Sequence, residues 1–167
     1  MYEIQLVPAT LVCVKRRGSV FMVYGTEPCA PHYKKWNMRG GKVEERDGWE
    51  PRRCAAREVW EESHEAIRIH PGELYELGTV SFRRIGSYTV WHVHVYIADR
   101  FEQMKPLRGK DVRWVPQDKV LSMDILPGDK HLFQYVLAEK RNDALMIRDA
   151  SGHVEWYLGA LQERWPA

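Results

Sequence analysis

Hydrophobic and polar residues alternate along several short segments of the chain, and this pattern favours β-strands. The alternation is clearest in residues 89–99, where apolar side chains fall on one face and histidine or tyrosine side chains on the other. Turn-forming residues such as glycine, proline and serine separate many of these segments. We expect further strands at residues 7–15, 20–24, 35–39, 74–83 and 112–115, and a closing hairpin of strands 144–148 and 154–158.

Two other segments have the composition or the spacing of helices. The first begins at Pro51, which suits the first turn of a helix because no N–H donor is needed there, and residues 52–66 favour its continuation. Cys54, Ala55 and Val59 fit the face of this helix that turns toward the core. We expect a second helix at 130–140, preceded by a short helical turn at 118–123 and a loop at 126–129.

Many strands with one helix near the middle and one late predict the α+β class with a mixed sheet. The length of 167 residues predicts a single domain, residues 1–167, with a proper core. A hydrophobic fraction of 44% and a charged fraction of 29% are typical of a soluble globular protein, and no apolar run reaches membrane-spanning length.

Charge and cysteine content narrow the function classes. A net charge of +2 is too small to indicate DNA binding, and no basic stripe suggests a long RNA groove. The three cysteines are widely spaced and form no CxxC motif, so we expect reduced thiols and no zinc site. With no signal-peptide pattern at the N-terminus, we expect a cytoplasmic protein that does not bind membranes.

Three carboxylates share one face of the first predicted helix. Glu58, Glu61 and Glu62 stand at positions i, i+3 and i+4, and like charges at this spacing repel by about 0.2–0.5 kcal/mol per pair. A divalent cation such as Mg²⁺, which prefers oxygen ligands, would reverse that repulsion. The preceding Gly40 and Gly41 allow a tight turn that could bring a carbonyl to the same ion. Taken alone, the glutamates also fit a solvated acidic face.

Gly41 and the run Arg57-Glu58-Val59-Trp60-Glu61-Glu62 resemble the Nudix box, G-x5-E-x7-R-E-U-x-E-E-x-G-U, in which U is aliphatic. The resemblance is strong in the box and looser over most of the chain. It implies a mixed sheet between α-helices, with the box forming a loop, a helix and a loop. It also implies that Glu58, Glu61, Glu62 and the carbonyl of Gly41 bind Mg²⁺ or Mn²⁺.

The chain departs from the box pattern at two places. Gly41 and Arg57 are two residues further apart than the pattern requires, which predicts an insertion in residues 44–49. Counting back from Arg57 puts Trp49 at the first box glutamate, which in the family pairs with the box arginine, and leaves the neighbouring Glu50 as a replacement. His64 and Glu65 stand where the pattern has glycine and an aliphatic residue.

Asn37, at the end of a predicted strand, has the amide group that reads purine edges, although turn asparagines are equally common. The order of motifs from Trp36 onward is similar to that of the MutT-like oxidised purine nucleoside triphosphatases. That resemblance implies base contacts from Asn37, Asp129, Phe82 and Thr10, although the loop 126–129 lacks the tryptophan and the first aspartate of the eukaryotic enzymes. Lys42, beside the glycine pair, is a candidate phosphate ligand.

Several other residues have both a structural and a functional interpretation. Strand tryptophans such as Trp91 and Trp114 more often belong to a core than to a base-stacking platform. His92 and His94 more often line a partly wet sheet face than bind a metal. Asp111 precedes a strand where some relatives supply a further acid, either as metal ligand or as base.

The resemblance therefore implies a Mg²⁺-dependent Nudix pyrophosphohydrolase that converts a nucleoside triphosphate to monophosphate and pyrophosphate, with an oxidised purine such as 8-oxo-dGTP as the candidate substrate. Its catalytic residues would be Glu61 as the base with Arg57 and Glu58. A Nudix hydrolase of ADP-ribose, a dinucleoside polyphosphate or a triphosphorylated RNA 5′ end is one alternative. A non-catalytic nucleotide-binding module is the other. Either a monomer or a homodimer fits the sequence.

Overall fold

A twisted mixed sheet forms the centre of the protein. The computed structural model describes residues 3–84, 86–139, 146–148 and 154–158. Within these residues the main sheet has eight strands, with the order β3-β2-β1-β6-β5-β10-β9 and with β8 paired to β2. The strands are β1 (Gln5–Arg16), β2 (Ser19–Tyr24), β3 (Trp36–Asn37), β5 (Tyr75–Arg84), β6 (Thr89–Ala98), β8 (Val112–Pro116), β9 (Met146–Arg148) and β10 (Val154–Leu158).

The long strands β1 and β6 run parallel through the middle of the sheet. Their register runs from Gln5↔Thr89 to Val14↔Ala98, whereas the other strand pairs are antiparallel. A second, two-stranded sheet joins β4 (Ile67–Arg68) to β7 (Glu102–Gln103). This small sheet ties the segment after the first helix to the segment that leads into β8.

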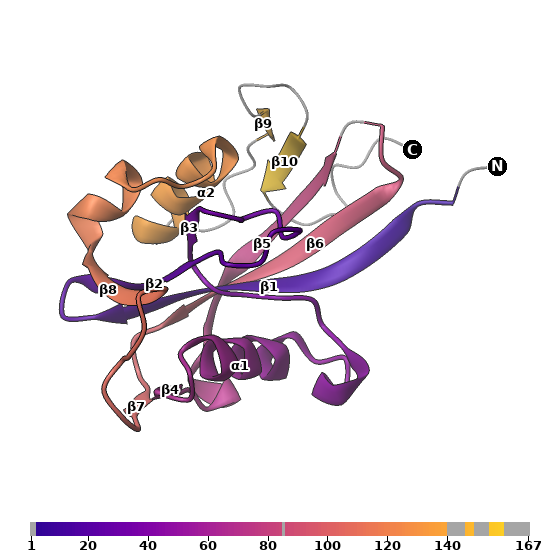
Figure 1. Ribbon diagram of the computed structural model, residues 1–167. Coiled ribbons are helices and arrows are strands. Elements are labelled where there is room, and N and C mark those ends of the chain that lie inside the picture. Colours follow the sequence, from indigo (N-terminus) through magenta and orange to yellow (C-terminus); the bar gives the residue numbers. More distant parts are fainter. Residues whose placement is uncertain (1–2, 85, 140–145, 149–153, 159–167) are drawn as a thin grey trace.

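The two α-helices cover opposite faces of the main sheet (Figure 1). Helix α1 (Pro51–Glu62) buries Ala55 and Val59 in a cluster with sheet residues that include Val12 and Tyr96. Helix α2 (Pro127–Leu137) buries its apolar face in a second cluster on the other side. Three 3-10 helices complete the described elements: η1 (Glu45–Asp47), η2 (Pro71–Glu73) and η3 (Gln117–Ser122).

The α+β class, the mixed sheet and its placement between helices are confirmed. The predicted strands are all present, some with shifted ends, and the turn of the closing hairpin lies outside the described residues. The short elements β4, β7, η1 and η2 were not expected, because a few residues carry no periodicity.

The helix ends differ from the prediction. Helix α1 ends at Glu62, four residues early, because His64 and Glu65 have left-handed backbones, with φ of 54° and 62°. Helix α2 begins at Pro127, so Gly128 and Asp129 lie in its first turn and not in a loop. Proline is tolerated there because the first turn needs no intrahelical N–H donor. No helix in the described part of the chain combines the length and apolarity needed to cross a membrane.

Candidate active site

The loop that contains Gly40 and Gly41 packs directly against the carboxylate of Glu58 on α1. The carbonyl of Gly41 accepts a hydrogen bond from the backbone N–H of Thr10 at 2.9 Å, which fixes the loop to β1. A Cβ atom at position 41 would lie 2.2 Å from Oε1 of Glu58, so any other residue there would displace that carboxylate. The loop and the carboxylate therefore form one closely packed unit at the surface of α1.

Asp47, which the sequence analysis missed, is the partner of Arg57. Its carboxylate accepts hydrogen bonds from Nε of Arg57 at 2.6 Å and from Nη2 at 2.9 Å, in the bidentate geometry that binds arginine strongly. Asp47 is 3% exposed and also accepts a hydrogen bond from the backbone N–H of Glu44 at 3.0 Å. The hydrogen bonds of Arg57 hold the pKa of Asp47 below its usual value, and Asp47 in turn raises the pKa of Arg57.

The expected replacement by Glu50 is not seen. Glu50 pairs instead with Arg53, at 2.7 Å between Oε2 and Nε, on the exposed side of the helix start. The two extra residues of the loop fall after Asp47 and not before it. Gly48 and Trp49 have φ of 66° and 58°, and Trp49 is 63% exposed. Counting forward from Gly41 with the five-residue spacing of the box leads to Asp47.

Guanidinium groups balance the three box carboxylates. Arg57 donates to Oε1 of Glu58 at 2.7 Å and to Oε2 of Glu61 at 3.1 Å. Arg46 reaches the other oxygen of Glu61 at 3.3 Å, and Arg39 is hydrogen-bonded to Glu62. Burial raises the pKa of Glu58, and the hydrogen bond from Arg57 opposes that rise.

These residues suit a hard divalent cation in donor type. The carboxylates and the carbonyl of Gly41 offer oxygen ligands, and the absence of a Cβ at position 41 lets the carboxylate of Glu58 approach the glycine backbone closely. Among the described residues, however, no three histidine, cysteine, aspartate or glutamate side chains converge closely enough to hold a metal ion. The glutamates are instead held by arginines, so binding of a cation needs local rearrangement.

The residues expected to contact the base fall on two faces of the sheet. Phe82 stacks on Trp91, with ring centroids 6.1 Å apart, on the face covered by α2. Asp129 is buried in the first turn of α2 and is bound by Nε2 of His32 at 3.0 Å. These two residues therefore belong to the α2 side.

Thr10 and Asn37 belong to the α1 side. The hydroxyl of Thr10 lies 3.6 Å from Sγ of Cys54 on α1, where it supports the glycine loop. Asn37 pairs with Val23 in the antiparallel ladder and shares its face, which packs toward α1. Asn37 is buried, and its Oδ1 has no hydrogen-bond partner in the structure. The structure thus does not bring all four base-contact candidates together.

The remaining polar candidates have local partners or are exposed. Lys42 is exposed next to Gly41, where phosphates could reach it. His92 lies 2.9 Å from the hydroxyl of Ser81, and His94 lies 2.8 Å from Glu76, so both histidines line a partly buried sheet face. Oδ2 of Asp111 lies 3.1 Å from Nε2 of His64, just beyond the end of α1.

A mixed sheet between two helices, with a glycine loop and an arginine-braced row of glutamates on one helix, defines the class of the protein. The sequence profile of the NUDIX domain matches residues 5–136. The chain belongs to the Nudix family. In sequence it is 31% identical over 109 residues to the oxidized purine nucleoside triphosphate hydrolase of Mus musculus. That match covers 64% of this chain and 65%, just under two thirds, of the mouse protein.

Solved structures share the fold. A MutT protein from Bacillus halodurans superimposes with a TM-score of 0.66 at 21% identity, covering 91% of this chain and 97% of that one. The NUDIX domain of NrtR from Shewanella oneidensis, solved with ADP ribose, superimposes with a TM-score of 0.55 at 17% identity, covering 81% and 88%. At these sequence identities the similarity shows the fold alone.

Proposed function

We propose that this protein is a Mg²⁺-dependent Nudix pyrophosphohydrolase that acts on nucleoside triphosphates. The observation that carries the proposal is the buried pair of Asp47 and Arg57, which fixes Glu58 against the Gly41 loop. This network holds carboxylates in one orientation, as a binding or catalytic site requires.

In this proposal Glu58, Glu61, Glu62 and the carbonyl of Gly41 hold the cation, with Mn²⁺ as a possible substitute for Mg²⁺. When bound, the cation would neutralise phosphate charge and lower the pKa of a water molecule. Arg57 orients Glu58 and Glu61, and Glu61 accepts the proton of the attacking water. Glu61 is 45% exposed, so water reaches its carboxylate freely.

The preferred substrate in this proposal is an oxidised purine nucleoside triphosphate, which would be cleaved to a monophosphate and pyrophosphate. The support is the 31% identity with the mouse hydrolase over 109 residues. Removal of damaged nucleotides fits a cytoplasmic location, where the cysteines stay reduced. On this view Asn37, whose buried Oδ1 lacks a partner, contacts the base, together with Phe82, Asp129 and Thr10. Lys42 would contact the phosphates.

One observation favours a second substrate. Because Thr10 and Phe82 lie on opposite faces of the sheet, the base pocket expected for 8-oxo-dGTP is divided. A Nudix hydrolase of ADP-ribose or of a dinucleoside polyphosphate would use the same carboxylates with a different base contact, and the Nudix domain of NrtR was solved with ADP ribose. A triphosphorylated RNA 5′ end and a purely binding module remain further alternatives.

The test is a panel of dGTP, 8-oxo-dGTP, ADP-ribose, diadenosine polyphosphates and triphosphorylated RNA, each assayed with and without Mg²⁺. We expect Mg²⁺-dependent turnover of 8-oxo-dGTP above dGTP, lost in Glu61→Gln and retained in the control Glu50→Gln. Preference for another compound would replace the substrate but keep the carboxylate chemistry. Nucleotide binding without any turnover would favour the binding module, and an unchanged rate in Glu61→Gln would refute the assigned base.

A further inference from the structure

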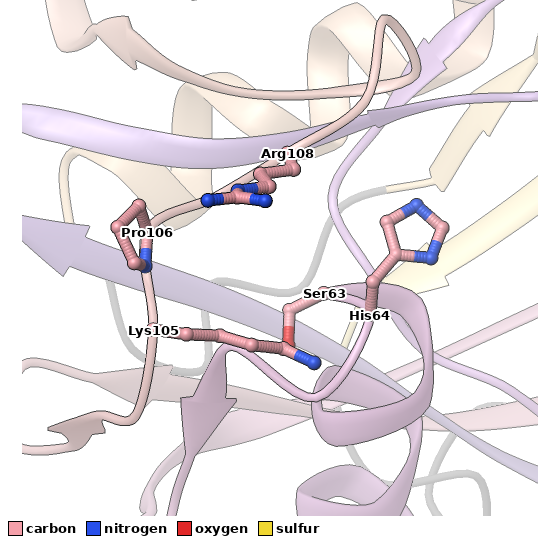
Figure 2. A pocket seen from close by; sticks show the side chains of 5 residues that line it. All are labelled: Ser63, His64, Lys105, Pro106 and Arg108. Atoms are coloured by element: carbon pink, nitrogen blue, oxygen red, sulfur yellow. The ribbon is translucent and has the colours of Figure 1, made fainter.

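A basic pocket lies immediately beyond the end of α1. Its volume is about 360 Å³, which is within the range of about 300–1,000 Å³ typical of small-ligand sites. Figure 2 shows the lining side chains, which come from the end of the helix and from the segment between β7 and β8. The residues that line it are Ser63, His64, Lys105, Pro106 and Arg108.

The segment 105–108 is held over the helix end from both sides. Before it, the backbone N–H of Met104 donates to the carbonyl of Ala66 at 2.9 Å. After it, Asp111 is bound to His64, and Gly109 packs so closely that a Cβ there would lie 2.5 Å from Oδ1 of Asp111. The glycine has a φ of 129°, a conformation that other residues rarely adopt. Contacts therefore hold both ends of the segment 105–108.

Two of the five lining residues, Lys105 and Arg108, are cations, and none of the five is acidic. In Figure 2 the side chain of Lys105 runs along one side of the opening, and the guanidinium of Arg108 lies on the opposite side. Lys105 has one weak ion pair, at 3.7 Å from Glu65, and Arg108 has no ion pair in the described part of the chain. Arginine offers a planar pair of donors that matches phosphate oxygens, and lysine adds a compact charge.

The C-terminus of α1 repels an anion less than a typical helix C-terminus does. A helix C-terminus carries roughly half a negative charge because its last carbonyls lack partners. In α1, backbone N–H groups of the following turn satisfy three of them: Ser63 donates to Val59, His64 to Glu61 and Glu65 to Trp60, at 3.0, 3.1 and 2.8 Å. Two carboxylates border the pocket, Glu65 beside Lys105 and Asp111 beside His64, so the guanidinium of Arg108 provides most of the attraction for an anion.

We propose that this pocket is a second phosphate subsite, which takes the part of a polyphosphate chain that extends past the box carboxylates. Ser63, which lines the pocket, directly follows Glu62 in the chain, and this adjacency is the reason for assigning the pocket to the substrate. The ligand chemistry is a phosphate group. Its two sources are the terminal phosphates of a nucleoside triphosphate and the distal half of a dinucleoside polyphosphate. This inference rests on the proposed function for its biological role, but not for its test.

The test measures binding of inorganic tripolyphosphate by calorimetry in EDTA at low salt, so neither turnover nor a metal contributes. We compare the wild type with Arg108→Gln and Lys105→Gln, and we use Arg53→Gln as the matched control. Arg53 is an exposed arginine near the other end of α1. We expect each pocket variant to weaken binding by roughly three- to tenfold, with no change in the control.

Absence of tripolyphosphate binding to the wild type, or equal affinity in all four proteins, would overturn the subsite even if the enzyme proves active. If binding behaves as expected but no nucleotide is hydrolysed, the subsite stands and the proposed function fails. With an active enzyme, the KM values of Arg108→Gln distinguish the two sources. A rise for the triphosphate assigns its terminal phosphates, and a rise only for the dinucleoside tetraphosphate assigns the distal half. No rise for either would refute the assignment to substrate.

Discussion

The pair of Asp47 and Arg57 gives the sharpest prediction about stability. Replacing Asp47 by alanine leaves Arg57, whose side chain is only 16% exposed, without its bidentate partner. Removing one partner of a buried ion pair typically costs about 3–5 kcal/mol, and because Arg57 keeps its hydrogen bonds to Glu58 and Glu61 we expect Asp47→Ala to fall at the lower end of that range. Asp47→Asn keeps the shape but not the charge, so we expect a smaller loss of about 1–3 kcal/mol.

Urea denaturation at pH 7 measures these losses, and Glu50→Ala is the matched control. Glu50 is half exposed and its pair with Arg53 lies at the surface, so its removal should cost below about 0.5 kcal/mol. The prediction reverses the assignment that counting back from Arg57 suggests. A loss for Glu50→Ala equal to that for Asp47→Ala would refute the structural assignment of the arginine partner.

The same pair predicts a pH dependence with a definite sign. The pKa of Asp47 is lowered in the folded protein, chiefly by hydrogen bonds from Arg57, relative to 3.8 in the unfolded chain. Its contribution to the free energy of unfolding is therefore full above pH 3.8 and is lost as the pH falls through the folded-state pKa. The stability difference between wild type and Asp47→Asn should shrink below about pH 4. A difference that stays constant down to pH 2 would contradict the ion pair.

Two further predictions test the site and the core. Gly41→Ala should lower kcat/KM on the order of 100-fold, because the added Cβ would displace the carboxylate of Glu58. Circular dichroism should show that the variant is folded. An unchanged rate would count against a role of the glycine loop in the site. At pH 8 a thiol reagent should label only Cys29 in the native protein and all three cysteines after unfolding. The reason is that burial raises the pKa of Cys54 to about 11 and that of Cys13 to about 12. Labelling of all three in the native state would refute that burial.

The elements with clear periodicity were predictable from the sequence alone. The strand of residues 89–98 alternates because one of its faces packs in the core below α2 while the other carries His92 and His94. The box helix was equally clear, since Pro51 fixes its start. Its end was not, because His64 and Glu65 adopt left-handed backbones that such residues seldom take.

Asp47 was missed for a specific physical reason. A spacing motif does not reveal on which side of its fixed residues an insertion falls. The two inserted residues, Gly48 and Trp49, bulge outward with left-handed backbones, so Asp47 keeps its distance from Gly41 while its separation from Arg57 in sequence grows. Counting from the glycine was therefore reliable, whereas counting from the arginine was not.

The base contacts were beyond the reach of sequence for another reason. Whether Asn37 and Phe82 share a pocket depends on which face each strand presents, and that face is set by pairing between distant segments. Asn37 follows the register of β3 with β2, whereas Phe82 follows that of β5 with β6. A shift of one residue in either register would reverse the face. The motif order alone does not contain this information.

The charges around the box suggest how the site can accept a cation without unfolding. Three arginines, Arg39, Arg46 and Arg57, face five acids, which leaves two net negative charges; the acids are Glu44, Asp47, Glu58, Glu61 and Glu62.

The three arginines differ in how firmly they are held. Arg57 is fixed by buried Asp47, but Arg46 is 56% exposed and already has a second partner in Glu44, at 2.6 Å. Exposed pairs of this kind are worth at most about 1 kcal/mol, so Arg46 can leave Glu61 at little cost. We therefore expect the buried pair to persist when a cation binds and the exposed contact to open. Glu61, the proposed base, would then be the first carboxylate released.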